Sequence, residues 1–87
     1  MESYKVLVGR SAAGELERIP KKDLRRRIVE RIRGLEAEPR PQGCEKLSAQ
    51  ERYRIRQGDY RIVYSIDDQD RTVEVVKIGH RSEIYGR

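Results

Sequence analysis

Alternating polar and apolar residues are clearest over residues 51–66, which read ERYRIRQGDYRIVYSI. Two alternating runs flank Gly58-Asp59, and a two-residue turn that begins with glycine is typical of a type II′ β-hairpin. The predicted cross-strand pairs are Gln57 with Tyr60, Arg56 with Arg61, Ile55 with Ile62, and Tyr53 with Tyr64. One face of this hairpin is therefore apolar and aromatic. The other sets two arginines directly opposite each other, which destabilises a sheet.

Helical spacing dominates the segment before the hairpin. Residues 4–8 alternate and predict a first strand. Ser11 is the expected N-cap of a short helix that ends at Pro20, and Asp23 is the expected N-cap of a second helix that ends before Pro39. An apolar stripe at helical spacing predicts the buried side of the second helix: Leu24, Ile28, Ile32 and Leu35.

Residues 72–78 form the last predicted strand, after a loop at residues 39–50, the hairpin and a turn at residues 67–70. In a regular strand Val73 and Val75 would point to one side, with Val76 and Ile78 on the other. Either both sides are covered or a bulge lies between Val75 and Val76. The order β-α-α-β-β-β predicts an α+β fold, with two helices packed on a twisted, mainly antiparallel four-stranded sheet.

Length and charge narrow the class of protein. A chain of 87 residues, 40% of them charged, predicts a single domain over residues 1–87 with one modest core. The net charge of +5 favours a polyanionic partner, either nucleic acid or an acidic protein. The single cysteine, Cys44, favours a reducing compartment. The N-terminal apolar run is too short for a signal peptide and no segment has the length of a membrane span. We therefore expect a cytoplasmic protein without a membrane partner.

The candidate chemistry lies in arginines. One histidine and one cysteine cannot form a zinc tetrad, so we expect no metal, and nothing indicates another cofactor. Arg54, Arg56 and Arg61 should share the sheet face opposite the helices. Such a face is usually only a solvated surface. The alternative is a phosphate site, because a polyanion relieves the repulsion and guanidinium groups hold phosphate oxygens bidentately. The basic run of the second helix, with Arg25 and Arg26, is either solvated or a contact to a nucleic-acid backbone.

Three segments together, YRIRQGDYRIVYSI, VVKIGHR and EIY, resemble the RelE/ParE superfamily of bacterial and archaeal toxins. The likeness covers essentially the whole chain and includes a linker pattern with Gly43, Lys46 and Leu47. RelE-type members are mRNA endonucleases that act in the ribosomal A site, whereas ParE-type members poison DNA gyrase and generally lack the basic catalytic set. The RelE branch implies a metal-independent, ribosome-dependent endoribonuclease. Its partners would be the 70S ribosome, mRNA and a cognate RelB-like antitoxin.

The resemblance also implies roles for individual residues. In the implied reaction, the 2′-OH of the RNA attacks the adjacent phosphate and forms a phosphorane. Arg54, Arg56 and Arg61 would stabilise the charge of the phosphorane, and Arg81 would clamp the transition state or act as the acid. Arginine is a poor proton shuttle, so the base for the 2′-OH proton would be Tyr85 or His80. The expected RNA contacts are Arg54, Arg56, Arg61, Lys46, Arg25 and Arg26. The alternatives are a ParE-like gyrase poison and a non-catalytic module that binds RNA or an antitoxin.

Overall fold

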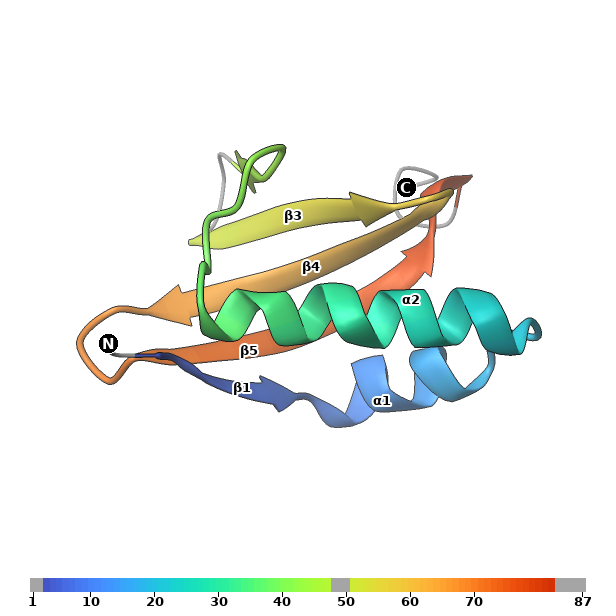
Figure 1. Ribbon diagram of the computed structural model, residues 1–87, viewed down its shortest axis with the longest axis horizontal. Helices are drawn as coiled ribbons and strands as arrows, with labels where there is room; N and C mark the ends of the chain where they lie inside the picture. Colours follow the sequence, from blue (N-terminus) through green and yellow to red (C-terminus); the bar gives the residue numbers. More distant parts are fainter. Residues whose placement is uncertain (1–2, 48–50, 83–87) are drawn as a thin grey trace.

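The computed structural model describes residues 3–47 and 51–82, and in it two helices pack on one side of a twisted five-stranded sheet (Figure 1). The helices are α1 (Arg10–Glu17) and α2 (Lys22–Arg33), and α2 continues into a short 3₁₀ turn, η1 (Gly34–Glu36). The strands are β1 (Lys5–Val8), β2 (Glu45–Leu47), β3 (Arg52–Gln57), β4 (Tyr60–Asp67) and β5 (Thr72–His80). No helix in the described part of the chain is long and apolar enough to cross a membrane.

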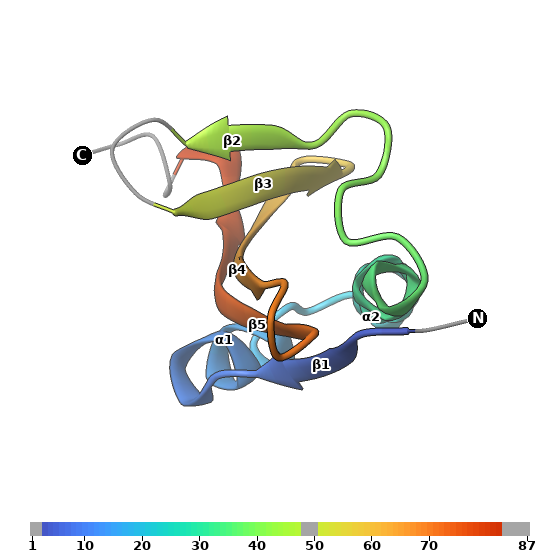
Figure 2. The same ribbon diagram turned by 90° about the vertical axis from the view of Figure 1, so that its left-hand side faces the viewer.

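The sheet is antiparallel except at one edge. Its strands lie in the order β1-β5-β4-β3-β2, and β1 runs parallel to β5. The predicted α+β fold is confirmed, but the sheet has five strands rather than the four expected. The additional strand, β2, lies within residues 39–50, which the sequence predicted as a loop. Three residues are too few for alternation to be recognised, and β2 is a strand because it pairs with β3 (Figure 2).

The hairpin formed by β3 and β4 has the predicted register. Arg56 pairs with Arg61 across the turn, and the other three expected pairs also form. Gly58 has a φ of 62°, whereas Asp59 is not among the residues with positive φ. This combination fits a type II′ turn, in which only the first central residue needs the left-handed region.

A bulge in β5 settles the question of which side its valines face. Val63 pairs with Lys77 but Tyr64 pairs with Val75, so Val76 is the extra residue on β5. The extra residue restores Ile78 to the side of Val75, and both are buried under the helices. Of the two alternatives left open by the sequence, the bulge is the one that occurs.

Both helices begin earlier than their predicted N-caps. Gly9 and Lys21 are the N-cap residues, so the expectation that Ser11 and Asp23 cap the helices is wrong. The Gly9 N–H donates to the Val75 oxygen at 2.8 Å, and this contact with β5 ends β1 and starts α1 directly. A Cβ on Gly9 would lie 3.1 Å from the same oxygen, so glycine suits the close approach. Asp23 instead lies in the first turn of α2, where its charge suits the helix dipole.

The core lies between the helices and one face of the sheet. Ile28, Ile32 and Leu35 of the predicted helical stripe are buried, and Leu24 packs at the margin. They contact a sheet face whose fully buried members include Tyr64 and the following residues: Ile55, Ile62, Val73 and Val75. Burying each large aliphatic side chain contributes roughly 1.5–3 kcal/mol, so this layer supplies most of the favourable energy of folding.

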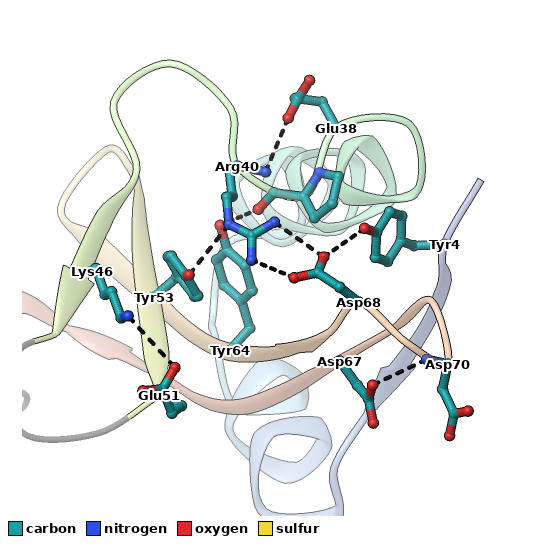
Figure 3. A network of polar contacts seen from close by, with 11 residues as sticks. Tyr4, Glu38, Arg40, Lys46, Glu51, Tyr53, Tyr64, Asp67, Asp68 and Asp70 are labelled. Atoms are coloured by element: carbon teal, nitrogen blue, oxygen red, sulfur yellow. Dashed lines mark hydrogen bonds and ion pairs between the residues drawn. The ribbon is translucent and has the colours of Figure 1, made fainter. Parts of the chain in front are cut away.

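A polar network ties the loop before β2 to the rest of the fold (Figure 3). The Arg40 guanidinium donates to both oxygens of Asp68, at 3.2 and 2.9 Å, and lies 5.1 Å from the centre of the Tyr53 ring. The Tyr4 hydroxyl donates to the same carboxylate at 2.6 Å. Below it, the buried Tyr64 hydroxyl donates to the Pro39 oxygen at 2.7 Å. The network therefore joins the start of β1, the loop and the β4–β5 turn.

The network makes the stability of the fold depend on Asp68. Its hydrogen bonds from Arg40 and then Tyr4 lower the pKa of this carboxyl to about 2. Because the folded pKa lies below the unfolded value of about 3.9, the stabilisation is complete well above pH 4 and is lost as the pH falls towards 2. We expect Asp68→Asn to lower the urea midpoint of unfolding near pH 7 and to flatten its fall between pH 5 and pH 2.

Asp70→Asn is the matched control, because Asp70 lies in the same turn and its carboxylate takes no part in the network (Figure 3). Urea is the suitable denaturant since it leaves charge interactions unscreened. Equal midpoints for the two variants at neutral pH would mean that the network adds nothing to stability.

Candidate functional site

The arginines of the β3–β4 hairpin lie on the sheet face opposite the helices. Arg54 and Arg56 come from β3, Arg61 comes from β4, and the register sets Arg56 against Arg61. We call these three residues the arginine face. They share a side because strand residues alternate, and Ile55 and Ile62, which are their immediate neighbours in sequence, point into the core.

The arginine face combines charge with burial. Arg54 and Arg61 have exposed fractions of only 9% and 7%, whereas Arg56 is exposed. Burial, followed by the charges of Arg56 and Arg61, lowers the pKa of Arg54 from its ordinary value. The direction of this shift means that the site disfavours its own positive charge. An anion placed here would relieve that cost, which is the property required of a phosphate site.

Glu45 is the residue of this site that the sequence did not reveal. Strand β2 sets Glu45 opposite Arg54, and the two side chains form an ion pair. The Glu45 side chain is 52% exposed, compared with 10% for Arg54, so the carboxylate is the more solvent-accessible partner of the pair. Only recognition of β2 could have indicated this contact, because the order of residues in a loop does not determine which strand residue they face.

His80 is not brought to the arginine face. It is the last residue of β5 and pairs with Tyr60, on the side of the sheet that carries the helices. The two rings meet edge to face, with centroids 5.7 Å apart and an angle of 84°. The imidazole Nδ1 accepts the Ser82 N–H at 3.3 Å. His80 thus fixes the backbone just after β5, and its place as a base beside the three arginines is not supported by this geometry.

Arg81 lies next to the β3–β4 turn. Its backbone N–H donates to the Asp59 oxygen at 2.8 Å, which continues the β4–β5 ladder by one residue, and its side chain is exposed. This position is at the same end of the sheet as Arg61, which pairs with Gly79. Tyr85, the other expected base, lies outside the described residues.

The remaining expected RNA contacts lie away from the arginine face. Lys46 pairs with Tyr53, on the helix side of the sheet, and its ammonium is 3.5 Å from the Glu51 carboxylate. Arg25 donates to the Ile19 oxygen at 2.9 Å and so helps to close the end of α1. Arg26 is exposed on α2. The chain therefore has two basic surfaces on opposite sides, and a single nucleic-acid phosphate cannot contact both.

The arginine face can bind and polarise a phosphodiester. Three guanidinium groups supply fixed positive charge, and one carboxylate lies beside them. In the described part of the chain, no three His, Cys, Asp or Glu side chains are close enough together to hold a metal ion. The candidate site therefore consists of the arginine face with Glu45, and Arg81 lies at its end.

Comparisons with known proteins all lead to one group of toxins. The sequence profile of the family described as ParE toxin of type II toxin-antitoxin system, parDE, matches residues 6–85. Toxin RelE of Mycobacterium tuberculosis is 37% identical over 84 residues, which cover 94% of this chain and 86% of that protein. The fold is similar to a chain of the M. tuberculosis toxin–antitoxin complex RelBE2, with a TM-score of 0.79, 28% identity, and 91% and 99% of the two chains covered. A chain of the archaeal RelE–RelB complex of Pyrococcus horikoshii OT3 gives a TM-score of 0.79 at 32% identity, covering 90% and 94%.

The like-charge pair across the hairpin should reduce stability measurably. Replacing Arg56 by Gln removes the charge opposite Arg61, and we expect the free energy of unfolding to rise by about 0.5 kcal/mol. Urea unfolding at low ionic strength is the measurement. Arg52→Gln is the matched control, since Arg52 lies on the same strand and face but opposite the neutral Ser65. If Arg56→Gln and Arg52→Gln changed the free energy of unfolding by the same amount, the repulsion between Arg56 and Arg61 would already be compensated.

Proposed function

The chain belongs to the RelE/ParE superfamily of type II toxins, and from this premise we propose that it is a ribosome-dependent endoribonuclease that cleaves mRNA in the A site. The observation that carries the proposal is the arginine face, because it concentrates three cations where two of them are nearly buried. Such an arrangement is unfavourable for the fold alone but stabilises the charge that develops on a phosphorane. The 37% identity to a toxin named RelE supports the same branch.

The reaction that suits this site needs no group beyond the RNA and the protein. The 2′-oxygen of the RNA attacks the adjacent phosphorus and forms a new O–P bond, and the bond from phosphorus to the 5′-oxygen breaks. A base takes the 2′-OH proton, and an acid gives a proton to the departing 5′-oxygen. The products are a 2′,3′-cyclic phosphate and a 5′-OH. Arg54, Arg56 and Arg61 would hold the non-bridging oxygens throughout.

The geometry adds a third candidate for the base. Tyr85 remains a candidate from the sequence, and His80 would have to act from the edge of the opposite face. Glu45 already forms an ion pair with Arg54, and a carboxylate is a group that can act as a general base. If the substrate phosphate took over Arg54, the released carboxylate would be available to accept the proton of the neighbouring 2′-OH. Arg81, at the end of the arginine face, would clamp or protonate the leaving group.

A ParE-like gyrase poison is the second candidate function. The family profile that matches residues 6–85 is the ParE profile, and this supports the candidate directly. A gyrase poison would not depend on the arginine face for catalysis. Substitution of a single residue of the arginine face therefore separates the two functions.

We expect purified toxin to cut mRNA at defined A-site positions on programmed ribosomes and to leave a 5′-OH end. Arg61→Ala should reduce the rate by at least a hundredfold, because one aimed charge is lost from the transition state. Arg52→Ala is the matched control and should retain most activity, because Arg52 is an exposed arginine at the start of β3. The toxin would be treated with EDTA, and the chelator removed before the ribosomes are added.

The same assay identifies the base. Glu45→Gln, Tyr85→Phe and His80→Asn each remove one candidate, and the asparagine retains an acceptor for the Ser82 N–H. The variant whose rate no longer rises with pH on the acidic side of the pH–rate profile, or which loses nearly all activity, marks the base. If folded wild-type protein did not cut mRNA and instead caused DNA damage in cells, the gyrase poison would replace the nuclease as the proposed function.

A RelB-like antitoxin is the proposed regulator. The structures of RelBE2 and of RelE–RelB are toxin–antitoxin complexes, which supports such a partner here. An apolar groove of about 240 Å³ lies beside β1, and its lining includes Val6, Val8, Leu16, Val29 and Ile32. Val8 is 39% exposed on a strand at the sheet edge, and an edge strand beside an apolar groove suits a segment that adds as a strand or helix.

Charge in this groove should prevent the antitoxin from binding. We expect Val8→Arg to weaken the complex with the RelB-like antitoxin at least tenfold, measured by calorimetry or by co-purification, while ribosomal cleavage persists. Leu7→Arg is the matched control, because Leu7 is also exposed on β1 but alternates to the other face of the sheet. Equal effects of the two substitutions would exclude the groove as the contact.

A further inference from the structure

A second concave site lies on the helix side of the sheet. It is a pocket of about 330 Å³ lined by Glu15, Arg18 and Ile19 of the α1 segment, by Tyr60, and by residues 77–79 of β5. Neither the arginine face nor the β1 groove includes it. Figure 1 places α1, the end of β5 and the β3–β4 hairpin at the same end of the molecule.

The pocket exists because β1 stops before β5 does. Val8 pairs with Val75, and beyond that pair α1 takes the place of a strand beside β5. The Glu15 carboxylate closes the open edge: it accepts the Ile78 N–H at 2.8 Å and the Lys77 ammonium at 3.0 Å. Both oxygens of Glu15 are thus engaged, and the charge of Lys77 is balanced.

Arg18 gives the pocket a net positive charge. No acidic partner of Arg18 occurs within residues 3–47 and 51–82, and its side chain is exposed at the pocket. The pair of Lys77 and Glu15 is neutral, so the local charge is that of the Arg18 guanidinium. A guanidinium at the margin of a pocket with a polar wall is suited to an oxyanion such as phosphate.

The rest of the lining suits a flat ring. Ile19 and Ile78 line the pocket and are almost fully buried. The Tyr60 ring is half-buried, and its orientation is fixed by the edge-to-face contact with His80. Aromatic rings bind nucleobases by stacking, which contributes roughly 1–3 kcal/mol per base. A volume of 330 Å³ is at the lower end of small-molecule sites and fits one nucleotide rather than a longer segment.

We propose that this pocket binds one nucleotide, with its base against Tyr60 and its phosphate on Arg18. This assignment rests on the proposed nuclease function: the bound nucleotide would be one that flanks the cleaved bond. Tyr60 and Arg61 are consecutive and point to opposite faces, while Gly79 both pairs with Arg61 and lines the pocket. An RNA strand that passes around this end of β5 therefore contacts the pocket and the arginine face together. The pocket would then contribute sequence preference.

The direct test is a titration of the Arg61→Ala variant with each of the four nucleoside 5′-monophosphates. Binding is measured from the NMR shifts of the backbone amides. We expect saturable shifts at Ile19, Ile78 and Gly79, weakened at least tenfold when Arg18→Glu is added. Arg27→Glu is the matched control: it makes the same charge change on the exposed surface of α2 and should leave the affinity unchanged. Ribose 5-phosphate should bind at least tenfold more weakly than the nucleotides, because it lacks the base.

Three results would overturn the inference: shifts confined to the arginine face, equal weakening by Arg27→Glu, or ribose 5-phosphate binding as tightly as the nucleotides. On ribosomes, Arg18→Glu should raise KM severalfold with kcat unchanged, and Tyr60→Leu should alter the preferred cleavage sequence. The two hypotheses fail separately. Nucleotide binding in the pocket by a chain that never cuts mRNA would refute the nuclease and keep the pocket, whereas normal cutting without pocket shifts would refute the pocket alone.

Discussion

The two-residue turn at Gly58-Asp59 is the constraint on which the rest of the structure depends. A turn of this length fixes the register of β3 and β4, and a slip of one residue would turn every side chain to the other face. The apolar residues of both strands therefore face the helices only if Arg56 and Arg61 face each other. The core and the charge cluster are consequences of the same register, so the repulsion cannot be relieved by a slip without exposing Ile55 and Ile62.

A neighbouring strand offsets part of the positive charge of the arginine face. Glu45 supplies the negative charge that meets Arg54, but only because β2 is held against β3. The position of β2 depends on the preceding loop, and Arg40 anchors that loop to Asp68 in the β4–β5 turn. An exposed network at one end of the sheet thus controls a carboxylate in the candidate site. Electrostatic compensation in this fold is arranged over residues that are far apart in sequence.

Periodicity predicted this fold well where a pattern repeats, and poorly where a single contact decides. The hairpin register and the helical stripe follow from spacing alone. The double row of valines in β5 left the bulge at Val76 as one of two alternatives, and only the pairing with β4 decides between them. The helix starts could not be predicted, because the bond from Gly9 to Val75 outweighs the local capping preference of Ser11. His80 lies beyond the last predicted strand, residues 72–78, whereas β5 continues through it and pairing with Tyr60 sets its side. Glu45 was missed because β2 is too short to recognise.

The positions of the two proposed binding surfaces limit how an antitoxin could act. The groove beside β1 lies on the helix side of the sheet, whereas the arginine face lies on the other side, two and three strands away on β4 and β3. A segment bound in that groove would leave Arg54, Arg56 and Arg61 uncovered. Inhibition through this contact would therefore work by preventing entry into a confined site such as the ribosomal A site, and not by shielding the charges. Short RNA oligonucleotides in free solution would still reach the arginines of such a complex.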